Sequence, residues 1–194
     1  MKWHHTAWLR AIERRLPYQI ALMHSKETVY LFARFPVRRD WLIELVYDAL
    51  LESAFADDTP DDTPDETLCD THRYSLLYTL HETPDFLQVG RKQGGDGTAY
   101  EIRIDERELL RLFQAARLQG DCALVSAVLE QERFASVRKA QRKISVMYKI
   151  FVPAKRVADA LNALERAGKL TSNGHLRTYG REVNEGGYAA RRGR

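Results

Sequence analysis

Basic side chains in the last third of the chain have types and spacings suited to binding phosphates. Arg138, Lys139, Arg142 and Lys143 form two adjacent pairs four positions apart. A helix over this segment would place both pairs on one positive face, because residues four apart are neighbours on a helix surface. Such a face binds the nucleic-acid backbone through its charge. The predicted nucleic-acid-binding set consists of Arg138, Lys139, Arg142, Lys143, Lys149, Phe151, Lys155, Arg156, Lys169, His175, Arg177 and Arg181.

The distribution of charge along the chain favours the same interpretation. Residues 131–194 contain 15 basic and 5 acidic residues, whereas residues 48–70 contain 9 acidic residues and no basic one. The net charge of the whole chain is only +3. A strongly basic segment attracts polyanions of any sequence. The acidic segment could instead neutralise the basic one within the fold, or the basic side chains could simply solvate helix faces.

A β-strand is predicted over residues 144–152, where branched and aromatic residues are dense. The alternation of a strand would place Lys149 and Phe151 on the same side. A lysine beside an exposed aromatic ring on a sheet is typical of proteins that stack single-stranded bases, and this pattern slightly favours RNA over DNA. Packing of Phe151 beneath a second helical layer would account for the same residues.

A second pattern in the same region points to DNA. After Pro153, residues 154–167 repeat apolar positions at helical spacing, and Asn173 and Gly174 then predict a tight hairpin. A helix followed by a basic hairpin resembles the recognition helix and wing of winged helix-turn-helix proteins, and helices predicted over 106–119 and 122–132 could complete such a unit. Because the predicted strand over 144–152 interrupts it, the sheet-based interpretation ranks first.

The motifs of common enzyme classes are missing from the sequence. The chain has no glycine-rich phosphate loop after a strand, no serine elbow and no HExxH motif. We therefore assign no catalytic residue and no cofactor, and an enzyme is the less favoured class. A small metal-independent ribonuclease stays as an alternative, with His175, Tyr179 and Arg177 as its candidate residues.

Histidines and cysteines do not form a recognisable metal motif. Cys69 and His72 are close in sequence and His81 follows them, but structural zinc sites combine two close pairs of ligands. His4 and His5 stand at a predicted helix start, where a tandem pair is more typical of packing or of the surface than of chemistry. No metal site is predicted.

An alternative of a different class is a protein-interaction module, acting as an inhibitor or adaptor. Residues 57–66 are acidic and contain DDTP twice, which predicts an exposed linker because proline stops helices and like charges repel. In the helix predicted over 41–55, Glu44, Asp48 and Glu52 form one strip and the remainder is largely apolar. Such a helix is either the centre of a core or an interface for a protein partner or for a second copy of the chain.

Apolar periodicity places helices and strands along the chain. Helices are predicted over 2–16, 41–55, 106–119, 122–132 and 154–167, and strands over 18–23, 28–35, 74–80, 86–89, 100–104, 144–152 and within 170–178. Asp105 is predicted to cap the helix that begins at 106, and Gly120 to end it. This order favours an α+β fold with antiparallel sheets covered by helices, with a ferredoxin-like C-terminal half as one option. The predicted division is 1–55, an acidic linker 56–70, an α+β body 71–180 whose C-terminal part is basic, and a basic glycine-rich tail 181–194.

Composition places the chain among globular proteins, with 44% hydrophobic and 29% charged residues. No apolar run is long enough to span a membrane, and the N-terminus lacks the apolar region of a secretory signal. Two cysteines cannot form a disulfide framework, which indicates a reducing compartment. We therefore predict a cytoplasmic protein without a membrane partner that binds RNA or DNA, as a subunit of a larger complex.

Overall fold

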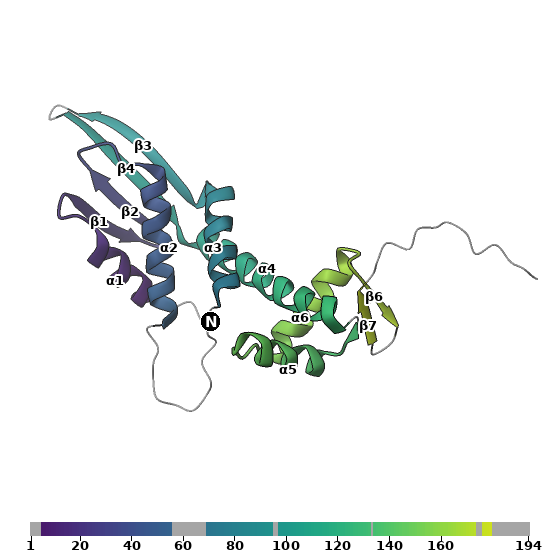
Figure 1. The fold of residues 1–194 in the computed structure, drawn as a ribbon. Helices are drawn as coiled ribbons and strands as arrows, with labels where there is room; N and C mark the ends of the chain where they lie inside the picture. Colours follow the sequence, from purple (N-terminus) through teal and green to yellow (C-terminus); the bar gives the residue numbers. More distant parts are fainter. Residues whose placement is uncertain (1–4, 56–68, 95–96, 133, 174–175, 180–194) are drawn as a thin grey trace, which may run out of the picture. The chain divides into compact units, whose positions relative to one another are not determined.

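The computed structural model describes residues 5–55, 69–94, 97–132, 134–173 and 176–179 (Figure 1). The described residues confirm the predicted α+β fold, with helices packed against antiparallel sheet. They divide into two compact units, unit 1 (residues 1–120) and unit 2 (residues 121–194). Most of the acidic segment and the whole tail from residue 181 lie outside the described residues, so the predicted linker and tail stay predictions.

Unit 1 is built around one four-stranded antiparallel sheet of order β1-β2-β4-β3. Two β-hairpins are joined through their second strands, since β2 pairs with β4 from Thr28↔Asp105 to Ala33↔Tyr100. The elements in chain order are α1 (His5–Arg15), β1 (Ile20–Ser25), β2 (Thr28–Ala33), α2 (Arg39–Phe55), α3 (Asp70–Glu82), the short 3-10 helix η1 (Pro84–Phe86), β3 (Leu87–Gly94), β4 (Gly97–Asp105) and α4 (Glu106–Glu132).

One face of this sheet forms the core of unit 1 with the helices. Strand alternation puts Val29 and Leu31 of β2 and Ile102 and Ile104 of β4 on that face, and all four are fully buried. The helices contribute Trp8, Ile12, Leu42 and Leu50 among others to the same apolar cluster. The Asp105 cap is confirmed, because its Oδ1 accepts a hydrogen bond from the Glu108 N–H at 3.0 Å.

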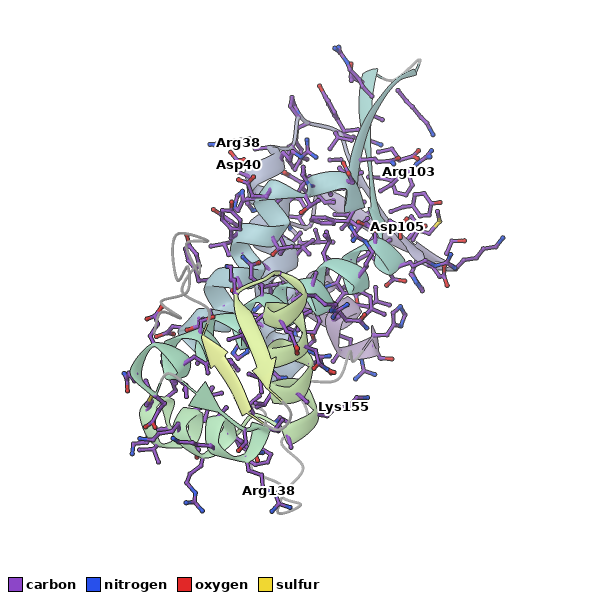
Figure 2. All side chains as sticks on the ribbon, turned by 90° about the vertical axis from the view of Figure 1, so that its right-hand side faces the viewer. Arg38, Asp40, Arg103, Asp105, Arg138 and Lys155 are labelled. Atoms are coloured by element: carbon purple, nitrogen blue, oxygen red, sulfur yellow. The ribbon has the colours of Figure 1, made fainter. Side chains whose placement is uncertain are left out.

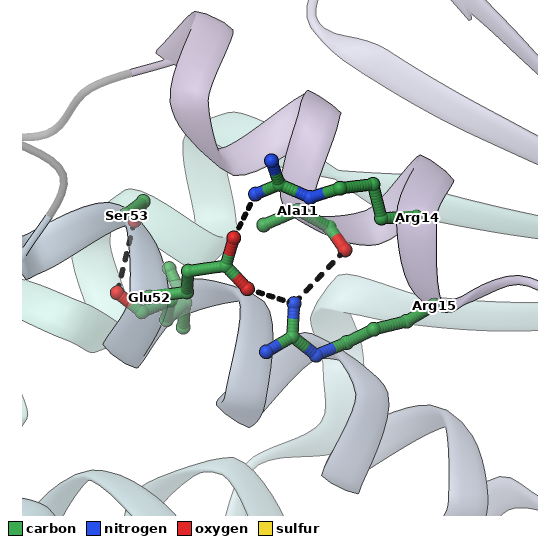
Figure 3. A network of polar contacts seen from close by, with 6 residues as sticks. Ala11, Arg14, Arg15, Glu52 and Ser53 are labelled. Atoms are coloured by element: carbon green, nitrogen blue, oxygen red, sulfur yellow. Dashed lines mark hydrogen bonds and ion pairs between the residues drawn. The ribbon is translucent and has the colours of Figure 1, made fainter.

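The mostly apolar helix α2 lies inside unit 1. Leu42, Val46 and Leu50 are buried, and the strip of acidic residues lies at the surface, with Glu44 and Asp48 exposed and Glu52 partly buried. Glu52 pairs with Arg14 and Arg15 of α1, and Arg15 also donates to the Ala11 carbonyl at 3.2 Å (Figure 3). The apolar side chains around most of α2 are therefore explained by burial in the core of unit 1. An oligomer contact through α2 stays a prediction.

The strand predicted over 74–80 is wrong, because this segment lies within helix α3. Its buried positions His72, Leu76 and Leu80 are four residues apart, which is helical spacing. Tyr74 and Tyr78 are exposed and lie against each other, with ring centroids 6.3 Å apart. The tyrosines repeat every four residues on one side of the helix, and the leucines repeat every four residues on another. Because the two series are offset by two residues, together they gave the alternation expected of a strand.

The helix end predicted at Gly120 is also wrong, since α4 continues without a break to Glu132. A Cβ at Gly120 would stand 2.5 Å from Cδ2 of the buried His72 ring. The glycine therefore serves the close approach of α4 to α3 within unit 1 instead of ending a helix.

Unit 2 places a three-stranded antiparallel sheet of order β5-β7-β6 beside helices. It contains the end of α4, then β5 (Phe134–Ala135), α5 (Val137–Tyr148), α6 (Ala154–Arg166), β6 (Leu170–Asn173) and β7 (Leu176–Tyr179). The helix after Pro153 and the hairpin at Asn173 are confirmed, and Gly168 with φ of 70° directly follows the C-cap Ala167 of α6.

The strand predicted over 144–152 is wrong, and this correction changes the architecture of unit 2. Residues 144–148 belong to α5, whose N-cap Ser136 accepts a hydrogen bond from the Lys139 N–H at 3.3 Å. Ala140 and Ile144 face the core one helical turn apart. The β-branched residues favoured a strand locally, but burial of one helical face outweighs that propensity.

With this helix in place, unit 2 has the order helix, strand, helix, helix, strand, strand. That order and the sheet order β5-β7-β6 agree with the winged helix-turn-helix alternative considered from the sequence. The ferredoxin-like option for the C-terminal half is not confirmed. The buried apolar residues of unit 2 include Leu124, Val125, Val128, Leu129, Ile144, Val157, Leu161 and Leu164.

Candidate nucleic-acid interface

The turn between α5 and α6 is held by contacts of its own backbone and neighbours. Lys149 adopts φ of 56° and donates its N–H to the Ser145 carbonyl at 3.1 Å, which ends α5. Gln141 Nε2 donates to the Val152 carbonyl at 2.9 Å. Ile150 and Val152 are buried whereas Phe151 between them is 42% exposed. These contacts fix the angle at which α6 leaves the turn.

A buried ion pair fastens α6 to the end of α4. Arg156 Nε and Nη2 donate to the two oxygens of Asp121 at 2.9 and 2.7 Å, and the two side chains are only 12% and 3% exposed. Such a paired, two-bond contact orients the helix that carries it. Arg156 belongs to the predicted nucleic-acid-binding set, but its guanidinium faces inward, so we leave it out of the surface proposed below.

Helix α5 splits each of the two predicted pairs of cations, because adjacent residues point to different sides of a helix. Lys139 and Lys143 both bind Glu132, at 2.7 and 2.6 Å, and these hydrogen bonds lower the pKa of Glu132 from its ordinary 4.5 to about 2. Arg138 and Arg142 lie on the exposed side of the helix. The predicted single positive face is thus two rows, one facing Glu132 and one facing solvent.

The solvent-facing row of α5 continues to the end of the helix. Arg138, Arg142 and Lys149 follow one another at spacings of four and seven residues, and all are exposed. None of the three has an ion pair with another described residue. Figure 2 shows Arg138 of this row and Lys155 of α6 pointing away from the ribbon of unit 2.

Helix α6 presents a polar row opposite its buried face. Lys155, Asp159, Asn162 and Arg166 are exposed, whereas Val157, Ala160, Leu161 and Leu164 are buried. The sequence interpretation included Lys155 but missed Asn162 and Arg166. The signal was present, because the predicted helix 154–167 already placed these positions at i+7 and i+11 from Lys155.

The remaining predicted residues lie near the hairpin. Lys169 is exposed just before β6. Arg177 is in β7, where its backbone pairs with Ala135 and Ser172, but the position of its side chain is not described. His175 and Arg181 lie outside the described residues altogether. The contacts predicted for them, and the ribonuclease based on His175, stay predictions.

Two groups of potential ligands and nucleophiles occur in unit 1. Cys69 Sγ lies 3.2 Å from His72 Nδ1; burial would raise the pKa of the Cys69 thiol, but hydrogen bonds with His72 outweigh burial and lower it to about 7. Among the described residues, the potential metal ligands that converge are His5, His24 and Glu106, whose ligand atoms lie within 4.8 Å of one another. Sequence spacing missed this trio because its members come from three distant segments.

Comparison with protein-family models, with curated proteins and with solved structures finds no match to this chain. In the part of the chain that the structure describes, no helix has the length and apolar character needed to cross a membrane. Function is therefore inferred from the geometry and charge of the two units.

Proposed function

We propose that unit 2 binds double-stranded DNA, with the exposed row of α6 in the major groove and the cations of α5 on the phosphate backbone. The observation that carries this proposal is the helix-turn-helix α5–α6 beside the sheet β5-β7-β6, with Arg138, Arg142, Lys149 and Lys155 exposed and without ion pairs to described residues. In proteins of this type, the second helix enters the groove and the flanking elements contact the backbone.

A duplex fits this surface better than a single strand. The stacking predicted from the sequence placed Lys149 and Phe151 side by side on a strand, whereas both residues stand in the turn after α5. An isolated helix fits the DNA major groove, which is about 12 Å wide, but not the deep, narrow major groove of RNA. The slight preference for RNA therefore loses its support.

The side chains on α6 are types that read base edges. Lysine and arginine bind guanine, asparagine binds adenine, and an aspartate accepts a hydrogen bond from cytosine. Lys155, Asn162, Arg166 and Asp159 supply these groups on one exposed face. Backbone contacts from Arg138 and Arg142 would position the helix without reading sequence. In this proposal α5 sets the register on the duplex and α6 selects the bases.

The salt dependence of DNA binding tests the proposal. We would measure the affinity of the full chain for a labelled duplex of about 20–30 base pairs by fluorescence anisotropy, between about 50 and 200 mM salt. Replacing Arg138, Arg142 and Lys155 by alanine removes three exposed cations and should reduce the slope of log affinity against log salt by about two, because Arg138 and Arg142 contact phosphates whereas Lys155 contacts bases. None of the three makes an ion pair with a described residue, so folding should be unchanged.

A charge-matched control separates a local surface from general charge. Arg10, Arg34 and Arg91 are exposed cations of unit 1, and their triple replacement by alanine changes the net charge equally. The proposal predicts that this control keeps the slope of the unmodified protein. Equal loss in both triple variants, or no binding at the lowest salt, contradicts the proposal. Tighter binding of an RNA of the same length contradicts the choice of DNA alone.

A further inference from the structure

We propose that His5, His24 and Glu106 form a binding site in unit 1 for one divalent transition-metal ion of the zinc type. The three residues come from the start of α1, the end of β1 and the start of α4. The Glu106 N–H donates to the Glu27 carbonyl at 3.0 Å, which holds the start of α4 beside the β1–β2 turn. The fold thus brings two imidazoles and one carboxylate together from segments about 20 and 80 residues apart in sequence.

The carboxylate of Glu106 is buried and its two oxygens face the two histidines. Glu106 is only 7% exposed, and His24 Nε2 lies 2.9 Å from Oε2. His5 Nε2 lies 2.9 Å from Oε1, yet Oε1 is a buried atom without a hydrogen-bond partner among the described residues. The His5 contact is therefore close enough for an ion pair but lacks the alignment of a hydrogen bond.

This misalignment is what a shared metal ion would explain. In a direct hydrogen bond, the imidazole N–H points at the oxygen, whereas in a metal site the nitrogen and oxygen lone pairs both point at the ion. An unsatisfied buried carboxylate oxygen costs free energy, and coordination would satisfy it. A simple histidine–carboxylate cluster accounts for the His24 contact but leaves Oε1 unexplained.

The donor set and its dimensions select the class of ion. Two imidazole nitrogens and one carboxylate oxygen suit zinc and neighbouring transition metals, not calcium or magnesium, which prefer oxygen ligands. An ion about 2.1 Å from each donor needs the donors within about 4.2 Å of one another. The observed spread of up to 4.8 Å requires only small side-chain rotations.

Partial exposure of the histidines gives the ion a route in and an open position. The side chains of His5 and His24 are 42% and 29% exposed. Three protein ligands leave at least one position for water or a further ligand. The bound ion would link α1, the first hairpin and α4, so binding should stabilise unit 1 by mass action.

Titration of the full chain with zinc alone tests this inference without any nucleic acid. Protein without an affinity tag, treated with a chelator and dialysed, would be titrated with Zn²⁺ by calorimetry and with Co²⁺ by visible absorption. We expect one equivalent per chain and a rise in the melting temperature of unit 1. His5→Gln and His24→Gln should each weaken binding at least about tenfold, since loss of a ligand exceeds the effect of losing an outer-shell partner.

Matched controls keep the test decisive. His81→Gln on α3 and Glu13→Gln on α1 alter exposed residues outside the trio and should leave affinity unchanged. Glu106→Gln should also abolish the site, and circular dichroism checks that this buried variant is folded. Absence of zinc binding, or binding that persists in both His5→Gln and His24→Gln, overturns the inference and leaves the DNA-binding proposal untouched.

Discussion

Units 1 and 2 contain the same number of basic residues but use them differently. Residues 1–120 carry 15 basic and 20 acidic residues, whereas residues 121–194 carry 15 basic and 7 acidic residues. In unit 1, Glu52 binds Arg14 and Arg15, and the carboxylate of Glu101 binds Lys92 and Arg103. Hydrogen bonds from Lys92 and Arg103 hold the pKa of Glu101 below its ordinary value.

In unit 2, too few carboxylates are present to do the same. Asp121 forms an ion pair with Arg156, and Glu132 forms ion pairs with Lys139 and Lys143. The exposed row of α5 has no acidic partner among the described residues. A count of cations is therefore a poor guide to a nucleic-acid surface. The informative quantity is which cations the fold leaves without a carboxylate.

Among the variants that test this difference between the units, Asp121→Asn should have the largest effect on stability. The change leaves the Arg156 guanidinium buried with a neutral partner, which should lower the free energy of unfolding of unit 2 by about 3–5 kcal/mol. Urea unfolding followed by hydrogen exchange of peptides from each unit would measure it. Asp40→Asn is the control, because the Arg38–Asp40 pair is 84% and 65% exposed and should contribute less than about 0.5 kcal/mol.

A second variant shows whether the loss comes from the unpaired charge. Replacing both Asp121 and Arg156 by leucine removes both buried charges and should cost less than Asp121→Asn alone. If Asp121→Asn is as mild as Asp40→Asn, the ion pair does not anchor α6 to α4.

Gly120→Ala should destabilise unit 1 by about 1–2 kcal/mol. Alanine favours a helix over glycine by about 1 kcal/mol, but overpacking ordinarily costs up to about 3 kcal/mol. The new methyl group would meet the His72 ring at 2.5 Å. Thermal unfolding would measure the loss, and His72→Ala in the same chain should remove the clash. A gain in stability from Gly120→Ala alone would show that His72 moves freely.

The two cysteines should differ in reactivity at neutral pH. The pKa of Cys69 is lowered to about 7, whereas burial, followed by the charge of Asp121, raises the pKa of Cys122 above its ordinary 9. Cys69 has the larger thiolate fraction at pH 7, although each of its thiolates is a weaker nucleophile. Together these effects predict that Cys69 is alkylated at least about fivefold faster than Cys122. Mass spectrometry after iodoacetamide treatment would measure both rates, and the difference should vanish in urea. Faster labelling of Cys122 would contradict the His72 contact.

The paired lysines of α5 should matter less for DNA than the exposed arginines. Lys139→Ala with Lys143→Ala removes two cations already bound to Glu132 and should reduce the salt slope by less than about one. Arg138→Ala with Arg142→Ala should reduce it by about two. Anisotropy under identical conditions compares them. Equal slopes for the two double variants would show that a lysine paired with Glu132 contributes to DNA binding as much as an unpaired arginine.

The smallest effect concerns the pH dependence of the Glu132 contacts. The folded pKa is lower than the ordinary value, so these contacts stabilise unit 2 fully above pH 4.5 and are lost as the pH falls to about 2. The difference in melting temperature between the unmodified protein and Glu132→Gln should be slight and should disappear over that range. A difference that grows on acidification would contradict the assignment.

Prediction from the sequence worked where periodicity and local signals agreed. Apolar periodicity and a local signal such as a cap, a proline or a turn residue predict the same element in five places. These are the first hairpin, the buried helix α2, the Asp105 cap, the helix after Pro153 and the Asn173 hairpin. It failed where propensity and burial disagree, since Ile144 and Val146 favour a strand in isolation but lie on a helix whose Ala140–Ile144 face is buried.

The site was only partly visible for a related reason. Charge clustering in the sequence included Arg138, Arg142 and Lys155, which the structure leaves exposed, but it did not separate them from Lys139 and Lys143. It could not show that Arg156 turns inward, since that depends on Asp121 from a different helix. The His5, His24 and Glu106 cluster was invisible because only the tertiary fold brings the three segments together.

A hydrogen-exchange footprint of the full chain with and without a DNA duplex tests the central claim most directly. At low salt, binding by unit 2 should slow exchange in peptides covering α5, the turn and α6, residues 137–166, with peptides from residues 5–120 unchanged. Protection confined to unit 1, or no protection at saturating duplex, would contradict the claim that the exposed helix-turn-helix face is the DNA-binding surface.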